Sequence, residues 1–282
     1  MKRTYEIAGH YFEVLGENLC ALMDTMAGFS PFLVEEGDVL FSLVEGEKAP
    51  FMQQEQYVFE YENVCGRFGK YECGYLLTLC PDGESPLYMW WDNDKKEICV
   101  QGNYSLRLYR FALWVAYGLM TLPYDTMAIH SSCVVYKSRS VLFLGESGTG
   151  KSTHTRLWRE NIDGATLLND DSPILRIEDG HVWAYGSPWS GKTPCYKNER
   201  YELKACVRLS QFSSNSIKKL TVLQSYGAIH PSCPPEFAYD GVLYDHVSRF
   251  IDKLLRNVSF YHLRCLPDRD ACILSRNTVF NE

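Results

Sequence analysis

The sequence predicts a mixed α/β fold in two parts, a β-rich amino-terminal subdomain and a second domain with helices around a mixed sheet. Three observations lead to this prediction. Short alternating runs rich in aromatic residues occupy 1–104, an apolar run leads into a glycine-rich segment at 141–152, and apolar residues recur at helical spacing over 240–257. We therefore expect the β-rich subdomain to cover 1–104 and the second domain 105–282.

The amino-terminal subdomain has the composition of antiparallel strands. Runs such as 57–61 (Tyr-Val-Phe-Glu-Tyr) and 88–91 (Tyr-Met-Trp-Trp) are separated by turn residues such as Asp82 and Gly83. This pattern is typical of strands joined by hairpins. Because no flexible linker is evident after these strands, we expect the subdomain to pack on the second domain.

The most apolar window of the chain predicts a connecting helix. Residues 111–122 are apolar around most of a helical circumference and are followed by Pro123. The window is shorter than the span of about 20 residues that crosses a membrane. We therefore predict a buried helix over 105–121.

A glycine-rich segment follows the apolar run 141–144. Residues 145–152 read Gly-Glu-Ser-Gly-Thr-Gly-Lys-Ser, which is the G-x-x-x-x-G-K-[ST] pattern between a strand and a helix. Glycines let the backbone curl until several N–H groups converge on phosphates at a helix N-terminus. The sequence therefore predicts binding of a nucleotide, ATP with Mg²⁺.

Each position of this loop is expected to contribute to nucleotide binding. The expected residues are Gly145, Glu146, Ser147, Gly148, Thr149, Gly150, Lys151, Ser152 and Thr153. Lys151 would reach the terminal phosphates as a point charge and take part in catalysis, and the Ser152 hydroxyl would ligate magnesium.

Two adjacent acids end the next apolar run. Asp170 and Asp171 follow residues 165–168, and at a strand end one acid can face the ion while the other faces the phosphoryl acceptor. We expect Asp170 to be the base that accepts the hydroxyl proton, and Asp171 to hold the metal with Ser152. A solvated turn is the alternative, because Asn-Asp-Asp-Ser-Pro also has turn composition.

A histidine lies in the apolar run 127–136, which we expect to pair through the turn 137–140 with the strand before the loop. His130 would then lie near the same end of the sheet as the acids. An imidazole there can orient an aspartate, touch the metal or relay a proton, since it titrates near neutrality. A core histidine with satisfied hydrogen bonds is the alternative.

A second glycine-hydroxyl-lysine segment covers 185–194 and follows an expected strand at 181–184. Lys192 in this segment is expected to contact the nucleotide or the acceptor, and a plain turn with a surface lysine is the alternative. Further on, Arg208 lies in the expected strand 203–209, where a charged side chain needs a carboxylate or phosphate partner.

The carboxyl-terminal residues predict a helix followed by a strand. Apolar residues at helical spacing indicate an amphipathic helix over 240–257, and a strand begins at Tyr261. His262 in this strand is expected to be structural.

The order His130-Ser131-Ser132, then the loop 145–152, then Asp170-Asp171, resembles the HPr kinase/phosphorylase and ATP-dependent phosphoenolpyruvate carboxykinase superfamily. The resemblance covers about residues 125–210 and is closest to HPr-kinase-like proteins with a Ser-Pro-Trp-Ser-Gly-Lys-Thr-like stretch. It implies a phosphoenolpyruvate-carboxykinase-like P-loop kinase core in which one acid serves the metal and the other acts as base.

The chain also departs from this superfamily. His154 stands where the family has an acid, and the downstream signature of the protein-substrate site is absent. HPr is therefore not the expected acceptor. The chain is also too short for a carboxykinase of this family, so decarboxylation is not expected.

These features predict an ATP-dependent kinase that transfers the γ-phosphoryl group to a hydroxyl of a protein, a peptide or a small metabolite. Two alternatives remain open: an ATP-binding switch or scaffold that transfers nothing, and an NTP hydrolase or phosphorylase. By analogy with the hexameric HPr kinases, a homo-oligomer is expected.

Composition narrows the partners and the compartment. The 282 residues carry a formal net charge of −7 without a basic run, which argues against nucleic acid as a partner. The amino terminus lacks the apolar stretch of a signal peptide, so we expect a cytoplasmic protein without a membrane partner. The 11 cysteines contain no C-x-x-C pair and are expected to be reduced thiols.

Overall fold

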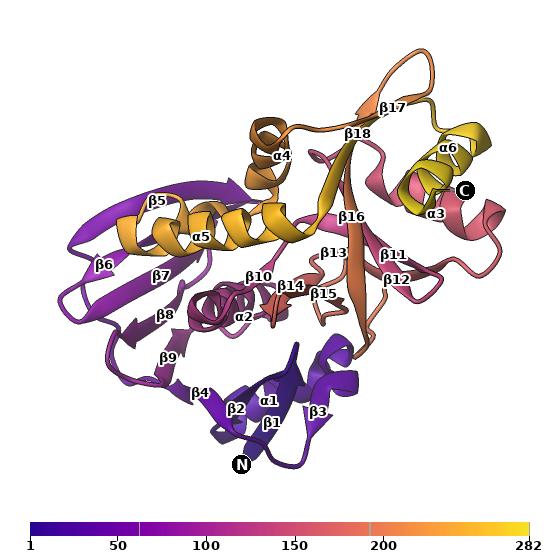
Figure 1. Cartoon of the computed structure of the whole chain (residues 1–282). Helices are drawn as coiled ribbons and strands as arrows, with labels where there is room; N and C mark the ends of the chain where they lie inside the picture. The colour runs from indigo at the N-terminus through magenta and orange to yellow at the C-terminus, as the bar shows by residue number, and fades with distance from the viewer. Residues whose placement is uncertain (62, 192, 282) are drawn as a thin grey trace. The chain divides into compact units, whose positions relative to one another are not determined.

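The structure, a computed structural model, describes residues 1–61, 63–191 and 193–281 (Figure 1). The chain divides into two compact units. The first contains Met1–Pro123 and Glu236–Tyr244, and the second contains Tyr124–Pro235 and Asp245–Glu282. Both units combine helices with a sheet that has parallel and antiparallel neighbours, so the mixed α/β class is confirmed at this level.

The first unit is built on a 9-stranded sheet. Its strands and helices are β1 (Lys2–Ile7), β2 (His10–Leu15), α1 (Glu17–Thr25), β3 (Leu33–Val34), β4 (Val39–Glu45), β5 (Gln54–Tyr61), β6 (Val64–Tyr71), β7 (Gly74–Pro81), β8 (Leu87–Asp92), β9 (Glu97–Gly102) and α2 (Leu106–Thr121). The strand order is β3-β1-β2-β4-β9-β8-β7-β6-β5. Neighbours are antiparallel, as predicted, except that β4 runs parallel to both β2 and β9.

The connecting helix predicted at 105–121 is α2, and it belongs to the first unit. The sequence prediction had grouped it with the second domain. Ser105 caps its N-terminus by accepting a hydrogen bond from the Leu108 amide at 3.4 Å. The Tyr117 hydroxyl donates to the Ile7 carbonyl at 2.9 Å, so the otherwise apolar helix is tied to β1 by a buried polar contact. This contact joins α2 to the amino-terminal strands in one unit.

A buried carboxylate, Asp240, joins the start of helix α5 (Gly241–Asn257) to the first sheet. Asp240 precedes α5 and accepts hydrogen bonds from the Val242 and Leu243 amides, each at 3.0 Å. The Tyr75 hydroxyl donates to it at 2.9 Å, and the Lys70 ammonium lies 2.5 Å away. A charge-assisted cap of this kind satisfies helix N–H groups that have no intrahelical partner.

The second unit contains the other sheet. Its strands and remaining helices are β10 (Thr126–Ala128), β11 (Ser131–Tyr136), β12 (Arg139–Leu144), α3 (Lys151–Asn161), β13 (Thr166–Asp171), β14 (Ile174–Glu178), β15 (His181–Tyr185), β16 (Arg200–Gln211), β17 (Ser216–Lys219), α4 (Val222–Ile229), β18 (Ser259–Cys265) and α6 (Arg269–Phe280). The main order is β10-β14-β15-β16-β12-β11-β13, with β18 beside β16 and β17 beside β18.

Strand direction places several carboxyl ends at one edge of this sheet. β12 runs parallel to β16, and β16 runs parallel to β18. β11 is antiparallel to both β12 and β13, so β13 has the same direction as β12. Ligand sites of open α/β sheets lie outside the carboxyl ends of parallel strands, and the glycine-rich loop 145–150 lies at this edge because it follows β12.

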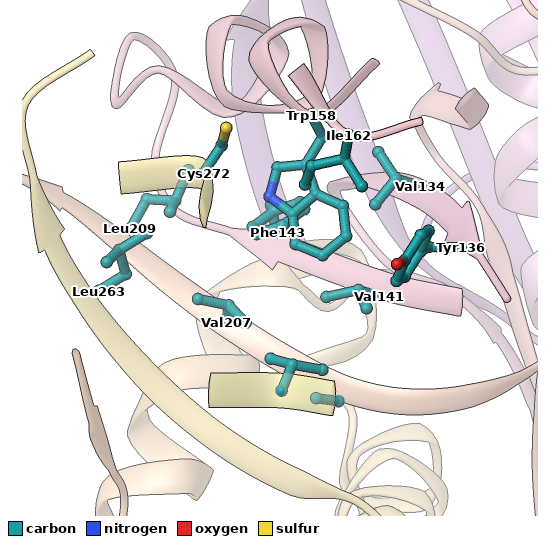
Figure 2. Close-up of a cluster of buried hydrophobic side chains, with 12 residues drawn as sticks. Val134, Tyr136, Val141, Phe143, Trp158, Ile162, Val207, Leu209, Leu263 and Cys272 are labelled. Atoms are coloured by element: carbon teal, nitrogen blue, oxygen red, sulfur yellow. The ribbon is translucent and has the colours of Figure 1, made fainter. Parts of the chain in front are cut away.

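The core of the second unit lies between the sheet and helices α3 and α6 (Figure 2). Trp158 of α3 is fully buried against Phe143 of β12, with their ring centroids 5.6 Å apart. Val207 and Leu209 of β16 point to the same face. Because side chains alternate along a strand, residues 206, 208 and 210 point to the opposite face.

The apolar run predicted as one strand at 127–136 is two strands. Ile129 and His130 lie between β10 and β11 and pair with neither strand. The Ile129 amide donates to the Pro173 carbonyl at 3.0 Å, and the His130 amide donates to the Ser232 carbonyl at 2.8 Å. Because these two amides bond outside the β-ladder, the strand is interrupted at Ile129 and His130.

Two further observations concern the cysteines and the helices. All 11 cysteines are free thiols in the structure. Among the described residues, no helix combines the length and the apolar character that crossing a bilayer requires.

Candidate functional site

The glycine-rich loop 145–150, called the phosphate loop after the function expected from its sequence, connects β12 to α3. Gly145, Gly148 and Gly150 have φ angles of 149°, 81° and 99°, which favour glycine over any residue with a side chain. A Cβ atom at Gly145 would also lie 2.5 Å from the Thr149 hydroxyl. The loop therefore turns tightly into the N-terminus of α3, where free N–H groups and the helix dipole favour an anion.

Lys151 is the first residue of α3 and its side chain folds back over the loop. Its ammonium donates to the Gly145 carbonyl at 2.7 Å and to the Glu146 carbonyl at 3.2 Å. The His130 Nε2 atom lies 3.2 Å from the same nitrogen. Burial lowers the pKa of Lys151, and the nearby Asp171 and Asp170 carboxylates oppose that shift. The Lys151 ammonium is thus held beside the loop by two neutral carbonyl oxygens.

Asp170 lies beside the start of α3. Its Oδ1 atom accepts hydrogen bonds from the Ser152 hydroxyl at 3.0 Å and the Ser132 hydroxyl at 2.8 Å. The residue is only 5% exposed. The Ser132 hydroxyl is also 3.1 Å from the Thr155 hydroxyl. The buried Asp170 carboxylate, the buried Ser132 and Thr155 hydroxyls and the more exposed Ser152 hydroxyl therefore form one cluster of oxygen atoms.

Asp171 points to a different partner. Its Oδ1 atom is 3.2 Å from His130 Nδ1, and the side chains of His130 and Asp171 are 47% and 37% exposed. His130 thus lies between Lys151 on one ring nitrogen and Asp171 on the other. The sequence prediction had paired Asp171, not Asp170, with Ser152; the structure instead places Asp170 beside that hydroxyl and Asp171 beside the histidine.

Ser132 received no role from the sequence, although it belongs to the motif that contains His130. The pairing of β11 with β13 sets Ser132 opposite Asp170 and Ser131 opposite Asp171. Residues directly opposite in a ladder have side chains on the same face. Side chains alternate along the Ser-Ser-Cys-Val run, so the sequence indicates which of its residues share a face. It does not indicate which residues of β13 lie opposite them.

The second glycine-hydroxyl-lysine segment packs against the end of β13. Lys192 lies outside the described residues. Beside it, the Gly191 amide donates to the Asp170 carbonyl at 2.7 Å. The Asn169 side-chain amide donates to the Ser187 hydroxyl at 3.1 Å and to the Trp189 carbonyl at 3.2 Å. Asn169, which the sequence did not indicate, therefore fixes this segment beside the two acids.

Two basic residues near the loop have distinct surroundings. Arg208 Nη2 lies 3.5 Å from the Glu146 carboxylate, which is the acidic partner that its place in a strand required. His154, in contrast, is buried, and burial lowers its pKa to about 4. Its ring lies 3.1 Å from the Ser275 hydroxyl and accepts from Trp158 Nε1 at 3.2 Å, so it belongs to the core.

Comparison with known proteins adds little to this geometry. No family model matches the chain, and no curated protein matches it. A solved structure of the Hpr(Ser) kinase/phosphatase from Coxiella burnetii is similar to 55% of this chain over 88% of its own length, with 14% sequence identity and a TM-score of 0.33.

Proposed function

We propose that this protein is an ATP-dependent kinase that transfers the γ-phosphoryl group to a hydroxyl of a protein, a peptide or a small metabolite. The observation that carries the proposal is the 3.0 Å contact between Ser152 of the phosphate loop and the buried Asp170. It brings a hydroxyl, a carboxylate and the N-terminus of α3 to one point, next to the Lys151 ammonium. Phosphoryl transfer depends on such positioning and charge, and needs little covalent chemistry from the protein.

The loop and Lys151 would bind the polyphosphate. Backbone N–H groups of 145–152 supply donors, and Lys151 would exchange its contacts with the Gly145 and Glu146 carbonyls for phosphate oxygens. Because these contacts are to neutral oxygens, no ion pair with a carboxylate has to break. The ammonium would then stabilise negative charge on the transferred group.

The residues beside the loop fit a magnesium ion. Magnesium prefers oxygen ligands and is commonly held by one or two carboxylates together with substrate phosphates and water. Ser152 and Asp170 offer a hydroxyl and a carboxylate oxygen 3.0 Å apart. When bound, the ion neutralises charge on the phosphates. Ser132 would position Asp170 through its 2.8 Å hydrogen bond.

Asp171 is the better candidate for the base, which reverses the division expected from the sequence. Asp170 is almost fully buried and accepts from two hydroxyls, whereas the Asp171 side chain is 37% exposed. Asp171 can therefore be reached by an acceptor hydroxyl and take its proton. His130 would orient the carboxylate through the 3.2 Å contact at Nδ1.

Incubation with γ-labelled ATP tests the proposal. The purified chain is mixed with labelled ATP, magnesium and a lysate of its own host, and the labelled product is identified by mass spectrometry. We expect label in a phosphorylated hydroxyl compound, and none with Lys151→Ala. Release of labelled inorganic phosphate alone would identify a hydrolase, and bound but unconsumed ATP would identify a switch; either result contradicts the kinase proposal.

A further inference from the structure

Basic side chains continue from the phosphate loop across the neighbouring strands. Leu144, the last residue of β12, lies opposite Arg208 of β16; Arg208 lies opposite His262 of β18; and His262 lies opposite Lys218 of β17. Arg208, His262 and Lys218 share the sheet face opposite α3 and α6, because Val207 and its neighbours occupy the other face. We call these three residues and Arg264, two positions after His262, the basic row.

The basic row has few acidic neighbours. Glu146 of the phosphate loop, whose side chain is 78% exposed, is the one carboxylate in ion-pair contact with it among the residues that the structure describes. Burial lowers the pKa of His262, and the charges of Lys218, Arg208 and Arg264 lower it further. Three cationic side chains and one imidazole therefore lie close together beside the loop for which phosphate binding is proposed.

An aromatic ring contacts one member of the basic row, Arg264. The Arg264 guanidinium lies 3.4 Å from the centroid of the Phe212 ring, and Phe212 is 42% exposed. The preceding residue, Gln211, donates its side-chain amide to the Gly148 carbonyl at the tip of the loop, at 3.1 Å. The partly exposed pair of Phe212 and Arg264 is thus linked to the phosphate loop through Gln211.

The two acids and the basic row lie on opposite sides of the loop. Asp171 is on β13, which is separated from β12 by β11, whereas the row begins on β16, the other neighbour of β12. In phosphoryl transfer the attacking and leaving oxygens are roughly in line with the phosphorus atom. An acceptor beside Asp171 therefore places the leaving nucleoside diphosphate over β16 and β18. Strands are about 4.8 Å apart, so Arg208 and His262 are about 5 and 10 Å from β12.

We propose that the basic row binds the nucleoside diphosphate part of the nucleotide, with Arg208 at its phosphates and with the base stacked on the Phe212–Arg264 pair. This inference rests on the proposed function, because the in-line argument assumes transfer to an acceptor beside Asp171. Guanidinium groups bind phosphate through paired N–H donors, and a base stacks well on aromatic and guanidinium planes. The stack would hold ADP during the displacement of the γ-phosphoryl group.

Calorimetric titration with three ligands tests the inference: MgATP, MgADP and magnesium tripolyphosphate, which has no base. We expect Phe212→Ala and Arg264→Ala each to weaken MgATP and MgADP binding by about 5- to 150-fold, the range that loss of one stacked base implies. Phe212→Ala, which removes no charge, should leave tripolyphosphate binding within about twofold. Phe212→Tyr should retain nucleotide binding, and Leu223→Ala, at an 83% exposed apolar position of the same unit, is the matched control.

The outcomes separate this inference from the proposed function. Unchanged MgATP affinity in both stacking variants would overturn the inference while leaving the kinase intact. Equal losses of nucleotide and tripolyphosphate affinity in Phe212→Ala would also overturn it, because the effect would not involve the base. A wild-type chain that binds none of the three ligands would overturn the proposed function and the inference together. Thermal unfolding of each variant verifies that it is folded.

Discussion

Each unit of the molecule buries one aspartate, and the two are held in different ways. Asp240 of the first unit lies against the Lys70 ammonium, the Tyr75 hydroxyl and the N-terminus of α5. The Asp170 carboxylate of the second unit accepts only from the Ser132 and Ser152 hydroxyls among the described residues. A buried carboxylate with a cationic partner is complete within the fold, whereas one surrounded by hydroxyls beside a phosphate loop is suited to a metal ligand.

The pKa of Asp240 reflects this difference. Burial by itself raises that pKa, but hydrogen bonds from Lys70, Gln56, the Leu243 amide and Tyr75 outweigh burial and lower it. The cluster is therefore most favourable with the carboxylate charged. We infer that Asp240 stabilises the first unit, whereas the role proposed for Asp170 in the second unit is to hold a metal ion.

The largest expected effect is on turnover. Asp171→Asn should lower kcat by about 10²- to 10⁴-fold, because the acceptor hydroxyl loses its general base. ATP affinity should change little, since the loop and Ser152 remain. Steady-state kinetics with the identified acceptor and a separate titration of MgATP measure the two quantities. Undiminished kcat in this variant would remove Asp171 from the mechanism.

Replacement of Asp240 should affect stability instead. Asp240→Ala removes a helix cap and leaves Lys70 and Tyr75 without their partner, so we expect the free energy of unfolding to fall by about 3 kcal/mol. Urea unfolding of the intact chain measures this change. The contrast with Asp170 would fail if Asp240→Ala unfolded at the wild-type urea concentration.

Acid should weaken the second unit before it affects Asp240. Burial lowers the pKa of His154 from 6.5 to about 4, with Asp268 opposing the shift, so the unfolded chain takes up this proton first as pH falls. His154 therefore contributes stability above pH 6.5 that is lost progressively down to about pH 4, at most about 3 kcal/mol.

Unfolding measured at several pH values tests this contribution. His154→Gln should flatten the loss of stability between pH 6.5 and 4. The Asp240 contribution has the same sign but a lower window, because it persists above the ordinary aspartate pKa near 3.9 and is lost only as pH falls through the depressed value. A His154→Gln chain with the wild-type slope over pH 4–6.5 would contradict the assignment.

The smallest expected effect is at the surface of α3. Arg156 lies 2.9 Å from Glu160 one turn along the helix, and both side chains are at least 50% exposed. Arg156→Ala should change the free energy of unfolding by less than about 0.5 kcal/mol, as usual for exposed pairs at this spacing. Kinetics should be unaffected. Arg156→Ala is therefore the control with which the changes in free energy of unfolding at Asp240 and His154 are compared.

Local sequence signals predicted many elements well. The helix expected at 105–121 is α2 at Leu106–Thr121, and the helix expected at 240–257 is α5 at Gly241–Asn257. Capping residues and apolar spacing define such helices locally. Partner choice in a sheet is not local, so alternation in the first unit gave no sign that β4 lies parallel to β2 and β9.

The same limit applies to the candidate site. The sequence grouped the loop, His130 and the acidic pair, but it paired Ser152 with Asp171 rather than Asp170. Which acid faces the loop depends on the register of β13 with β11, where Asp170 lies opposite Ser132. Neighbouring residues of a strand point to opposite faces, so a shift of one residue would exchange the two carboxylates.

The dependence of ATP affinity on magnesium tests the central claim most directly. ATP is titrated into wild type, Asp170→Asn and Asp171→Asn, each with magnesium and with a chelator. If Ser152 and Asp170 hold the ion, magnesium should strengthen ATP binding to wild type and Asp171→Asn but not to Asp170→Asn. Full magnesium dependence in Asp170→Asn, with its loss in Asp171→Asn, would contradict the account.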